Sequence, residues 1–287
     1  MYWPQYNLNS IGSLQNGAAY QIKMLNNENL TISGQLVSSD FYIPLSIGWS
    51  LVGYLNLDCD NIEDMMSSIV NDVVIMKDEN GNVYWPEFGL NSIGNMCPGK
   101  GYQIKLNNAV FFNYPSGGRF EFNLFNANNP IYYTSISNTG NNMTIGFPVS
   151  AWEVLPSVGD EIAAYSESGQ LIGSSVFLGN HIALTVWGDD LTTDNQDGLL
   201  IGESISFNLW SHQTNTTSEL IVANWESGTN LYSIDGISIA SNISLLKNDN
   251  FNTELLKTVD ILGRETDQKG FNLEIYNNGS IKKKYVQ

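Results

Sequence analysis

Basic residues are scarce in this chain. It has 12 Lys and Arg against 29 Asp and Glu, which gives a net charge of -17 at pH 7. Proteins that bind nucleic acid neutralise phosphates with a positively charged surface, so this charge argues against a nucleic-acid partner. Charged residues of both signs reach only 14% of the chain, below the roughly 25% of a typical soluble domain. An acidic surface favours solubility and attracts divalent cations in a weak, general way.

Long apolar segments are also missing. No apolar run reaches the roughly 18 residues of a membrane-spanning helix, so we expect a protein that does not span the membrane. The opening sequence MYWPQYNLNS has neither the basic start nor the apolar stretch of a signal peptide. The chain is therefore expected to be cytoplasmic or a piece of a longer polypeptide.

Reactive residues are few. The two histidines, His181 and His212, have no zinc-type spacing to another ligand, and no G-x-S-x-G phrase accompanies them. Phosphate-binding and dinucleotide-binding glycine motifs are absent as well. A carboxylate pair for glycoside hydrolysis is a spatial arrangement that a sequence does not reveal, and Glu153, Glu161 and Glu203 carry no special pattern. We expect that the protein is not an enzyme, that it has no catalytic residues, and that calcium is the one candidate cofactor.

Polar turn-forming residues take the place of the missing charges. Asn and Gly tolerate the left-handed and primed-turn conformations that β-hairpins require. Apolar residues make up 42% of the 287 residues, which is enough for ordinary cores, and this length predicts two or three compact units. The composition favours a mainly β fold.

One phrase occurs twice at a constant offset of 82. YWPQYNLNSIGSLQNGAAYQIKM (Tyr2–Met24) and YWPEFGLNSIGNMCPGKGYQIKL (Tyr84–Leu106) share 13 of 23 aligned residues, so the two segments are expected to share a structure. Only the second copy is preceded by an alternating strand pattern over Ile47–Leu57 and helical spacing over Asp60–Val74, with Asp58 or Asp60 as cap. A hairpin around ENGN and a strand with Tyr102 on its apolar face follow. We predict a small α+β repeat unit over 47–118 and a partial one over 1–46.

The missing half of the first copy has two explanations. The chain is the C-terminal part of a longer repeat-bearing polypeptide, or the gap is filled by a partner chain or by Leu30–Pro44. Trp85 and Tyr102 recur at fixed offsets in both copies, which favours a packing role, although exposed aromatic rings can also stack on sugars. Cys59 and Cys97 lie in the same unit. In an oxidising compartment they can pair as a disulfide, and the alternative is two separate buried thiols.

The second unit resembles a repeat found in secreted proteins of Bacteroidota. The pattern of that repeat is G-W-N-x-I-G-Y-L, a helix, I-V-K-D-x-x-G-x-x-Y-x-P-E, and N-x-I-G-x-x-x-P-G-x-G-Y-Q-I-K. The matching residues are Gly48, Trp49, Gly53, Tyr54, Lys77, Asp78, Gly81, Tyr84, Pro86, Ile93, Gly94, Pro98, Gly99, Gly101, Tyr102, Gln103 and Lys105. The resemblance implies no catalytic activity.

Short alternating segments separated by Gly, Asn and Pro follow from Arg119 onwards. They include RFEFNLF, IYYTSIS, NMTIGFPV and the hairpin YSESGQLIG (Tyr165–Gly173). Regular short strands of this kind predict an antiparallel β-sandwich, here over 119–246. The stretch from Gly159 to Trp210 also resembles a β-sandwich module of the same secreted proteins.

The loop WGDDLTTDNQDG (Trp187–Gly198) holds four aspartates within nine residues. Calcium takes six to eight oxygen ligands, and one Asp-rich loop can supply several of them, although this loop does not fit the EF-hand register. The alternative is a solvated turn whose Asp and Asn side chains bond their own backbone. The candidate calcium ligands are Asp189, Asp190, Asp194 and Asp197.

The last 41 residues, 247–287, are expected to form a short β tail. TVDILGRE predicts a strand ending in a turn, and FNLEIYNNGSIKKKYV predicts two strands around NNGS. This tail resembles the C-terminal sorting signal of type IX secretion cargo, which commonly reads V-D-x-L-G-R-E and then Y-I-Y-x-D-G-x-x-x-K-K. The matching residues are Val259, Asp260, Leu262, Gly263, Arg264, Glu265, Tyr276, Gly279, Lys282 and Lys283. Edge lysines that resist aggregation are a second explanation for the basic run.

These features predict a non-catalytic structural or adhesive module of a secreted protein. The resemblance implies an extracellular or outer-membrane-surface location and the type IX secretion machinery as a partner. Further partners are the chain itself, other surface proteins or extracellular glycans. The alternative is a carbohydrate-binding accessory region of an exported hydrolase.

Overall fold

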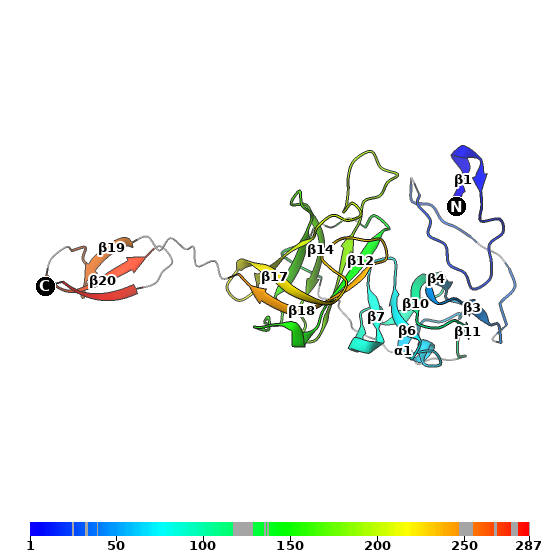
Figure 1. Cartoon of the computed structure of the whole chain (residues 1–287), viewed down its shortest axis with the longest axis horizontal. Coiled ribbons are helices and arrows are strands. Elements are labelled where there is room, and N and C mark those ends of the chain that lie inside the picture. The colour runs from blue at the N-terminus through cyan, green and yellow to red at the C-terminus, as the bar shows by residue number, and fades with distance from the viewer. Residues whose placement is uncertain are drawn as a thin grey trace. The chain divides into compact units, whose positions relative to one another are not determined.

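The computed structural model describes residues 1–24, 26–31, 34–38, 40–116, 129–134, 136, 138–246, 255–266, 269–276 and 281–286. The fold is mainly β, built of several antiparallel sheets with little helix, as the composition predicts (Figure 1). The chain divides into two compact units, Met1–Leu245 and Leu246–Gln287. The strand predicted at RFEFNLF lies outside the described residues. Within the described part, no helix combines the length and apolar character needed to cross a bilayer.

The second repeat copy belongs to a five-stranded antiparallel sheet. Its strand order is β4 (Gly48–Gly53), β10 (Gly101–Leu106), β6 (Val73–Lys77), β7 (Val83–Trp85) and β8 (Leu90–Asn91). The predicted ENGN hairpin joins β6 to β7, and β10 returns between β4 and β6. Short pairs formed by β3 (Ile43–Leu45) with β11 (Val110–Phe112) and by β5 (Asp60–Asn61) with β9 (Asn95–Met96) complete the unit, together with the 3-10 turn η2 (Pro86–Phe88).

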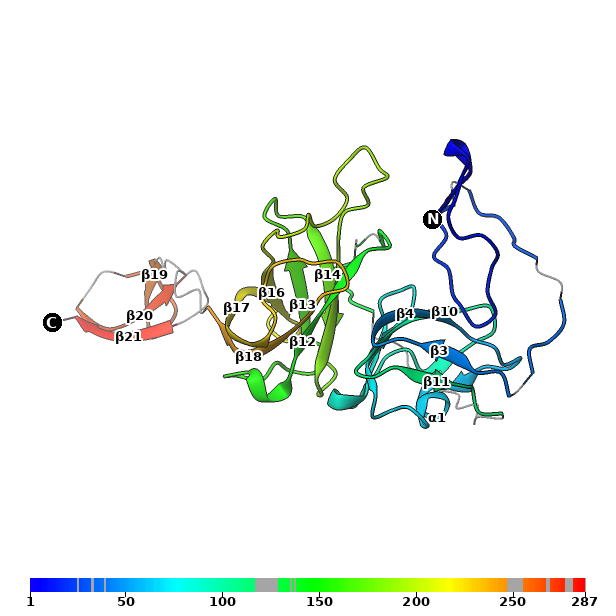
Figure 2. The same cartoon turned by 45° about the vertical axis from the view of Figure 1, so that its right-hand side comes forward.

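The helix of this unit is shorter than the apolar spacing predicts. Helix α1 spans Ile62–Met66, and the Asn61 side chain, not Asp58 or Asp60, caps it by accepting a bond from the Glu63 amide. Asp60 is engaged elsewhere, because its carboxylate accepts a 2.5 Å bond from the Tyr54 hydroxyl. The spacing still marks the buried face, since apolar residues beyond the helix remain in the core. Helix α1 and the strands β3 and β11 lie on the same side of β4 and β10 (Figure 2). The core contains Val52, Ile62, Met65, Met66, Ile69, Val73, Met76, Tyr102, Ile104 and Leu106.

The first repeat copy forms the same pair of short strands around a 3-10 turn, but this pair is separate from the five-stranded sheet. Strand β1 (Tyr2–Trp3) pairs with β2 (Leu8–Asn9) across the 3-10 turn η1 (Pro4–Tyr6). The following segment contacts the outer edge of β4, where the Gly53 amide donates to the Gly17 carbonyl at 2.9 Å.

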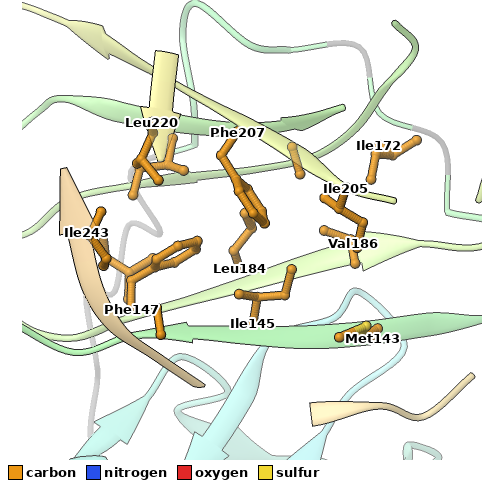
Figure 3. Packing of buried hydrophobic residues seen from close by; sticks show 14 of the residues in the cluster. Met143, Ile145, Phe147, Ile172, Leu184, Val186, Ile205, Phe207, Leu220 and Ile243 are labelled. Carbon is orange, nitrogen blue, oxygen red and sulfur yellow. The ribbon is translucent and has the colours of Figure 1, made fainter. Parts of the chain in front are cut away.

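The predicted sandwich region is one continuous seven-stranded sheet. The strand order is β14 (Leu171–Val176), β13 (Glu161–Tyr165), β16 (Ser206–Ser211), β17 (Thr216–Ser227), β18 (Ile237–Leu245), β12 (Asn142–Phe147) and β15 (Ile182–Trp187). All neighbours are antiparallel except β12 and β18, and the 3-10 turn η3 (Val149–Ala151) follows β12. The sheet curls so that its two end strands, β14 and β15, lie side by side. Its inner face encloses one apolar core, in which Ile145, Phe147, Leu184 and Phe207 converge (Figure 3).

The tail forms a unit of its own. It is an antiparallel three-stranded sheet of β19 (Leu255–Asp260), β20 (Gly270–Tyr276) and β21 (Ile281–Val286), in the order in which the strands occur in the sequence. The three predicted strands are thereby confirmed. The NNGS turn, with the signal residue Gly279, lies outside the described residues.

Candidate functional site

Strand β12 is buried on both of its faces. Met143, Ile145 and Phe147 point into the core of the curled sheet, as the alternation of NMTIGF predicts. The intervening residues, Asn142 and Thr144, are only 7% and 0% exposed. A single-sided sheet would leave these residues in water, so a second layer must cover them. That layer is the five-stranded sheet of the repeat unit.

The contact between the two sheets is called the module interface here. On the repeat side it is centred on Trp85, which is 1% exposed and packs edge-to-face on Phe88. Gly146 of β12 gives the indole room, because a Cβ there would lie 3.2 Å from the Trp85 ring. The Thr185 hydroxyl donates a 2.7 Å bond to the Gly81 carbonyl. The apolar residues of the module interface are Ile75, Val83 and Trp85, packed against Ala183, Ile237 and Ile239.

A lysine lies buried in the module interface. Lys77, at the end of β6, is 1% exposed, and its Nζ donates a 2.9 Å bond to Oδ1 of Asn142. The same Nζ lies 4.9 Å from the centroid of the Trp49 ring. Desolvation lowers the pKa of Lys77 to about 8, the Asp235 carboxylate raises it, and the neighbouring Lys105 lowers it further. An amine in this state is a usable nucleophile near neutral pH.

Asp235 is held beside this lysine from two directions. Its backbone amide donates to the Asn142 carbonyl at 2.9 Å. Its Oδ1 accepts a 2.7 Å bond from Nε2 of Gln103, and Gln103 is the cross-strand partner of Lys77 in the repeat sheet. The Lys77 amine therefore contacts the Asn142 amide directly, and the Asp235 carboxylate is bonded to Gln103, the cross-strand neighbour of Lys77. In the sequence, this cluster is marked by a lysine in register with the buried face of an apolar strand, a pattern that does not predict a function by itself.

The two cysteines form a disulfide. Cys59 and Cys97 are bonded, with Cα atoms 4.2 Å apart and 38 residues between them in sequence. The bridge ties the segment before β5 to the loop before β10. Of the two alternatives left open by the sequence, the structure contains the paired one.

The acidic loop uses its carboxylates to fold itself. Oδ1 of Asp189 accepts the amide of Asp197 at 2.8 Å, and Oδ1 of Asp197 accepts the amide of Asp190 at 2.9 Å. Asp190 also binds the amide and hydroxyl of Thr192 and forms an ion pair with Lys23. This hydrogen bond with Lys23 lowers the pKa of Asp190 to about 2. The pattern is that of a turn stabilised by its own side chains.

The calcium site stays a prediction. Within the described ranges, no three His, Cys, Asp or Glu side chains are grouped so as to hold a metal ion. Three of the candidate ligands, Asp189, Asp190 and Asp197, would have to exchange backbone or lysine partners for a cation. Calorimetry with calcium, and melting with and without a chelator, test the site directly.

A buried carboxylate holds the chain that enters the curled sheet. Glu161 is 1% exposed, and its two oxygens accept bonds of 2.7 to 3.1 Å from the successive amides of Ile131, Tyr132 and Tyr133. Tyr132 then stacks on Trp210, with ring centroids 4.8 Å apart. Glu161 had no distinguishing signal in the sequence. Its role here is to fix this segment in place.

Both histidines have structural partners. Nδ1 of His181 accepts the amide of Val149 at 3.1 Å, and its ring lies against Phe88. The backbone amide of His212 donates to Asp160 at 3.0 Å.

The sorting-signal residues lie in the tail. Oδ1 of Asp260 accepts the amides of Leu262 and Arg264, and the Arg264 side chain returns to its Oδ2. These bonds from Arg264 hold the pKa of the Asp260 carboxyl below its usual range. Gly263 occupies the left-handed region of the turn, with φ of 81°. Lys282 and Lys283 lie exposed on β21, opposite Glu274 and Leu273 of β20.

Comparison with protein-family models, curated proteins and solved structures found no match to this chain.

Proposed function

We propose that this chain is a non-catalytic structural or adhesive module of a secreted or cell-surface protein. The observation that carries the proposal is the double burial of β12, by its own core on one side and by the repeat sheet on the other. Two β modules that share such an interface resist relative motion. They therefore suit a protein whose task is to hold loops and surfaces in fixed positions.

Export through the type IX machinery is part of this proposal. Its support is the resemblance of the tail, the compactness of Leu246–Gln287 as a separate unit, and the disulfide, which is typical of oxidising compartments. The test expresses the chain behind an export peptide in a type IX-competent bacterium. We expect the intact chain on the surface or in the medium, and the chain lacking 247–287 retained in the periplasm. Equal export of both would refute the sorting role.

A structural role predicts self-association or attachment to another surface protein. Electron microscopy and light scattering of the purified chain test the first, since ordered filaments or larger assemblies would appear as concentration rises. Pull-down from outer-membrane preparations tests the second. A chain that stays monomeric and captures no surface protein would contradict this half of the proposal.

Carbohydrate binding is the second candidate, as part of an exported hydrolase. The observation that favours it is a group of exposed rings in the first repeat copy, where Tyr2, Trp3 and Tyr6 are 63%, 38% and 66% exposed. Flat exposed rings can stack on sugars. A glycan array would show specific polysaccharide binding that Trp3→Ala abolishes. The absence of any binding would leave the structural role as the better proposal.

A further inference from the structure

Lys77 and Asn142 are placed to react with each other. The Lys77 amine is held 2.9 Å from the side-chain carbonyl oxygen of Asn142, so the carbonyl carbon Cγ lies one covalent bond further on. Both side chains are buried, at 1% and 7% exposure. Fixing two reactants in a dry site raises their effective concentration by many orders of magnitude over the same groups free in water.

We propose that Lys77 and Asn142 join in an intramolecular isopeptide bond, with release of ammonia and with Asp235 as the proton carrier. The neutral Nζ of Lys77 attacks Cγ of Asn142, and a new C–N bond forms. The bond between Cγ and Nδ2 of Asn142 then breaks. The Asp235 carboxylate takes a proton from the attacking amine and passes it to the departing nitrogen, which leaves as ammonia. An ammonium side chain and a primary amide are thereby converted to a secondary amide and an ammonium ion, with no oxidant or reductant.

The surroundings of Lys77 favour the reactive form of its amine. Burial and the adjacent Lys105 both disfavour the ammonium ion. With a pKa of about 8, about half of the Lys77 side chains are neutral at pH 8 and about a tenth at pH 7. The Trp49 ring, 4.9 Å from Nζ, confines the side chain without offering a competing acceptor oxygen.

Asp235 is assigned the proton transfer because it is hydrogen-bonded to Asn142 and to Gln103, the cross-strand neighbour of Lys77. Its amide binds the Asn142 backbone, and its carboxylate binds Gln103, which lies opposite Lys77 in the sheet. A carboxyl group placed in this way can serve as general acid and base in turn.

The bond would connect β6 of the repeat unit to β12 of the curled sheet, 65 residues apart in sequence. It would cross the module interface and lock the two sheets covalently. Unlike the disulfide of Cys59 and Cys97, it would survive reducing agents. The inference rests on the geometry of the module interface and does not depend on where the chain is located.

Intact-mass measurement of the whole chain, reduced and denatured after incubation at pH 8, is the first test. We expect the wild-type mass to be lower than the sequence mass by one ammonia molecule. Lys77→Met and Asn142→Ala should each restore the full sequence mass expected for that variant. Lys100→Met is the matched control, because it removes an exposed lysine of the same unit, which pairs with Glu79, and should keep the loss.

Peptide mapping supplies the second readout. Succinimide formation at an asparagine that precedes a glycine also releases ammonia, and the chain has three such asparagines, Asn16, Asn80 and Asn278. The mass alone therefore does not identify the bond. In the proposed product, trypsin fails to cut after Lys77, and fragmentation identifies a branched peptide that contains Asn142. Asp235→Asn keeps an oxygen for Gln103 but has no carboxylate that can take up and release a proton, and we expect at least a tenfold slower loss of ammonia.

A wild-type chain of full mass after this incubation overturns the proposal. So does an ammonia loss that maps to Asn16, Asn80 or Asn278 while trypsin still cuts after Lys77. Loss of ammonia at an unchanged rate in Asp235→Asn, with the branched peptide present, would keep the bond and remove Asp235 from its formation. These outcomes are read on the wild type first, so a variant that fails to fold does not obscure them.

Discussion

The two copies of the repeated phrase have the same local geometry but very different surroundings. In both, the amide after the 3-10 turn donates to the proline carbonyl at 3.0 Å, from Asn7 to Pro4 and from Gly89 to Pro86. The donor residues share the left-handed conformation, with φ of 54° and 58°.

The burial of the two copies differs sharply. Trp3 is 38% exposed and Trp85 is 1% exposed, although both pack edge-to-face on the aromatic ring three residues later. Tyr2 and Tyr84, at 63% and 5%, show the same contrast. This contrast indicates that the repeated segment determines its own backbone conformation through short-range hydrogen bonds and ring contacts. The strands and helix that precede the second copy, and the curled sheet beyond it, supply the burial.

The largest expected difference between the copies is at the tryptophans. Trp85→Ala should lower the free energy of unfolding by about 3–5 kcal/mol, because it empties a filled site in the module interface. Trp3→Ala, the matched variant, should cost below about 1 kcal/mol, because the ring is partly solvated. Urea unfolding of the whole chain, followed by far-UV circular dichroism, measures both. Similar losses in the two variants would show that the first copy is buried in solution.

The disulfide of the second copy gives the next largest expected difference between the copies. The second copy has Cys97 where the first has Gln15, so only the second is tied to the segment before its helix. Replacing Cys59 and Cys97 together by serine should cost about 2–4 kcal/mol, since the bridge closes a loop between residues 38 apart in sequence. The melting temperature with and without reductant checks this. The double variant itself should show no further response to reductant; a response would point to an effect elsewhere.

Strand patterns could be predicted from the sequence because their periodicity is local. The alternation of Tyr102, Ile104 and Leu106, and that of Met143, Ile145 and Phe147, both mark buried faces in the structure. Cysteine placement within one repeat likewise allowed the disulfide, although it left two separate thiols as the alternative. In each case the information lies within a few residues or within one small unit.

The module interface could not be predicted in this way. Asn142, Thr144 and Gly146 are typical of a solvent face, yet β6 and β7, more than 50 residues away in the sequence, cover them. A charged residue such as Lys77 is expected to be exposed, although it is the last residue of β6 and lies on the buried face of that strand. At these positions, long-range contacts decide which residues are buried, and the local sequence pattern does not identify the strand that covers them.

A smaller contrast is expected at the tyrosine that follows the glycine turn. The Tyr102 hydroxyl accepts the Cys97 amide at 3.1 Å, and the Tyr20 hydroxyl accepts the Gln15 amide at 2.9 Å. Tyr102→Phe should lower the free energy of unfolding by about 1–2 kcal/mol, because Tyr102 is only 3% exposed and the Cys97 amide loses its hydrogen-bond partner there. Tyr20→Phe should cost below about 0.5 kcal/mol, because water can replace the hydroxyl at the exposed Gln15 amide.

An alkaline titration gives the tyrosine contrast a second measurement. Burial raises the pKa of Tyr102 to about 12. The folded state keeps this proton while the unfolded tyrosine, with a pKa near 10, loses it, so Tyr102 lowers stability as pH rises from about 10 to about 12. Tyr102→Phe should therefore weaken the alkaline loss of stability. An identical pH dependence in the variant and the parent would contradict the assignment.

The smallest effect is expected at the lysine that ends the phrase. Lys23 of the first copy pairs with Asp190, while Lys105 of the second lies 5.6 Å from the Trp49 ring centroid. The Lys23 side chain is 55% exposed, so Lys23→Ala should lower the free energy of unfolding by less than about 1 kcal/mol at neutral pH, and by less in high salt.

The effect of Lys23→Ala should also depend on pH. The pKa of Asp190 is lowered to about 2 from an ordinary 3.8, so the stabilisation by the ion pair is complete above about pH 4 and disappears as the pH falls through 2. Lys23→Ala and the parent should therefore converge in acid, whereas Lys105→Ala should keep its difference, because an aromatic ring does not titrate. Urea unfolding of the three chains at pH 7, 4 and 2 makes the comparison, and a Lys23→Ala difference that persists at pH 2 would show that this lysine acts through packing of its stem and not through its charge.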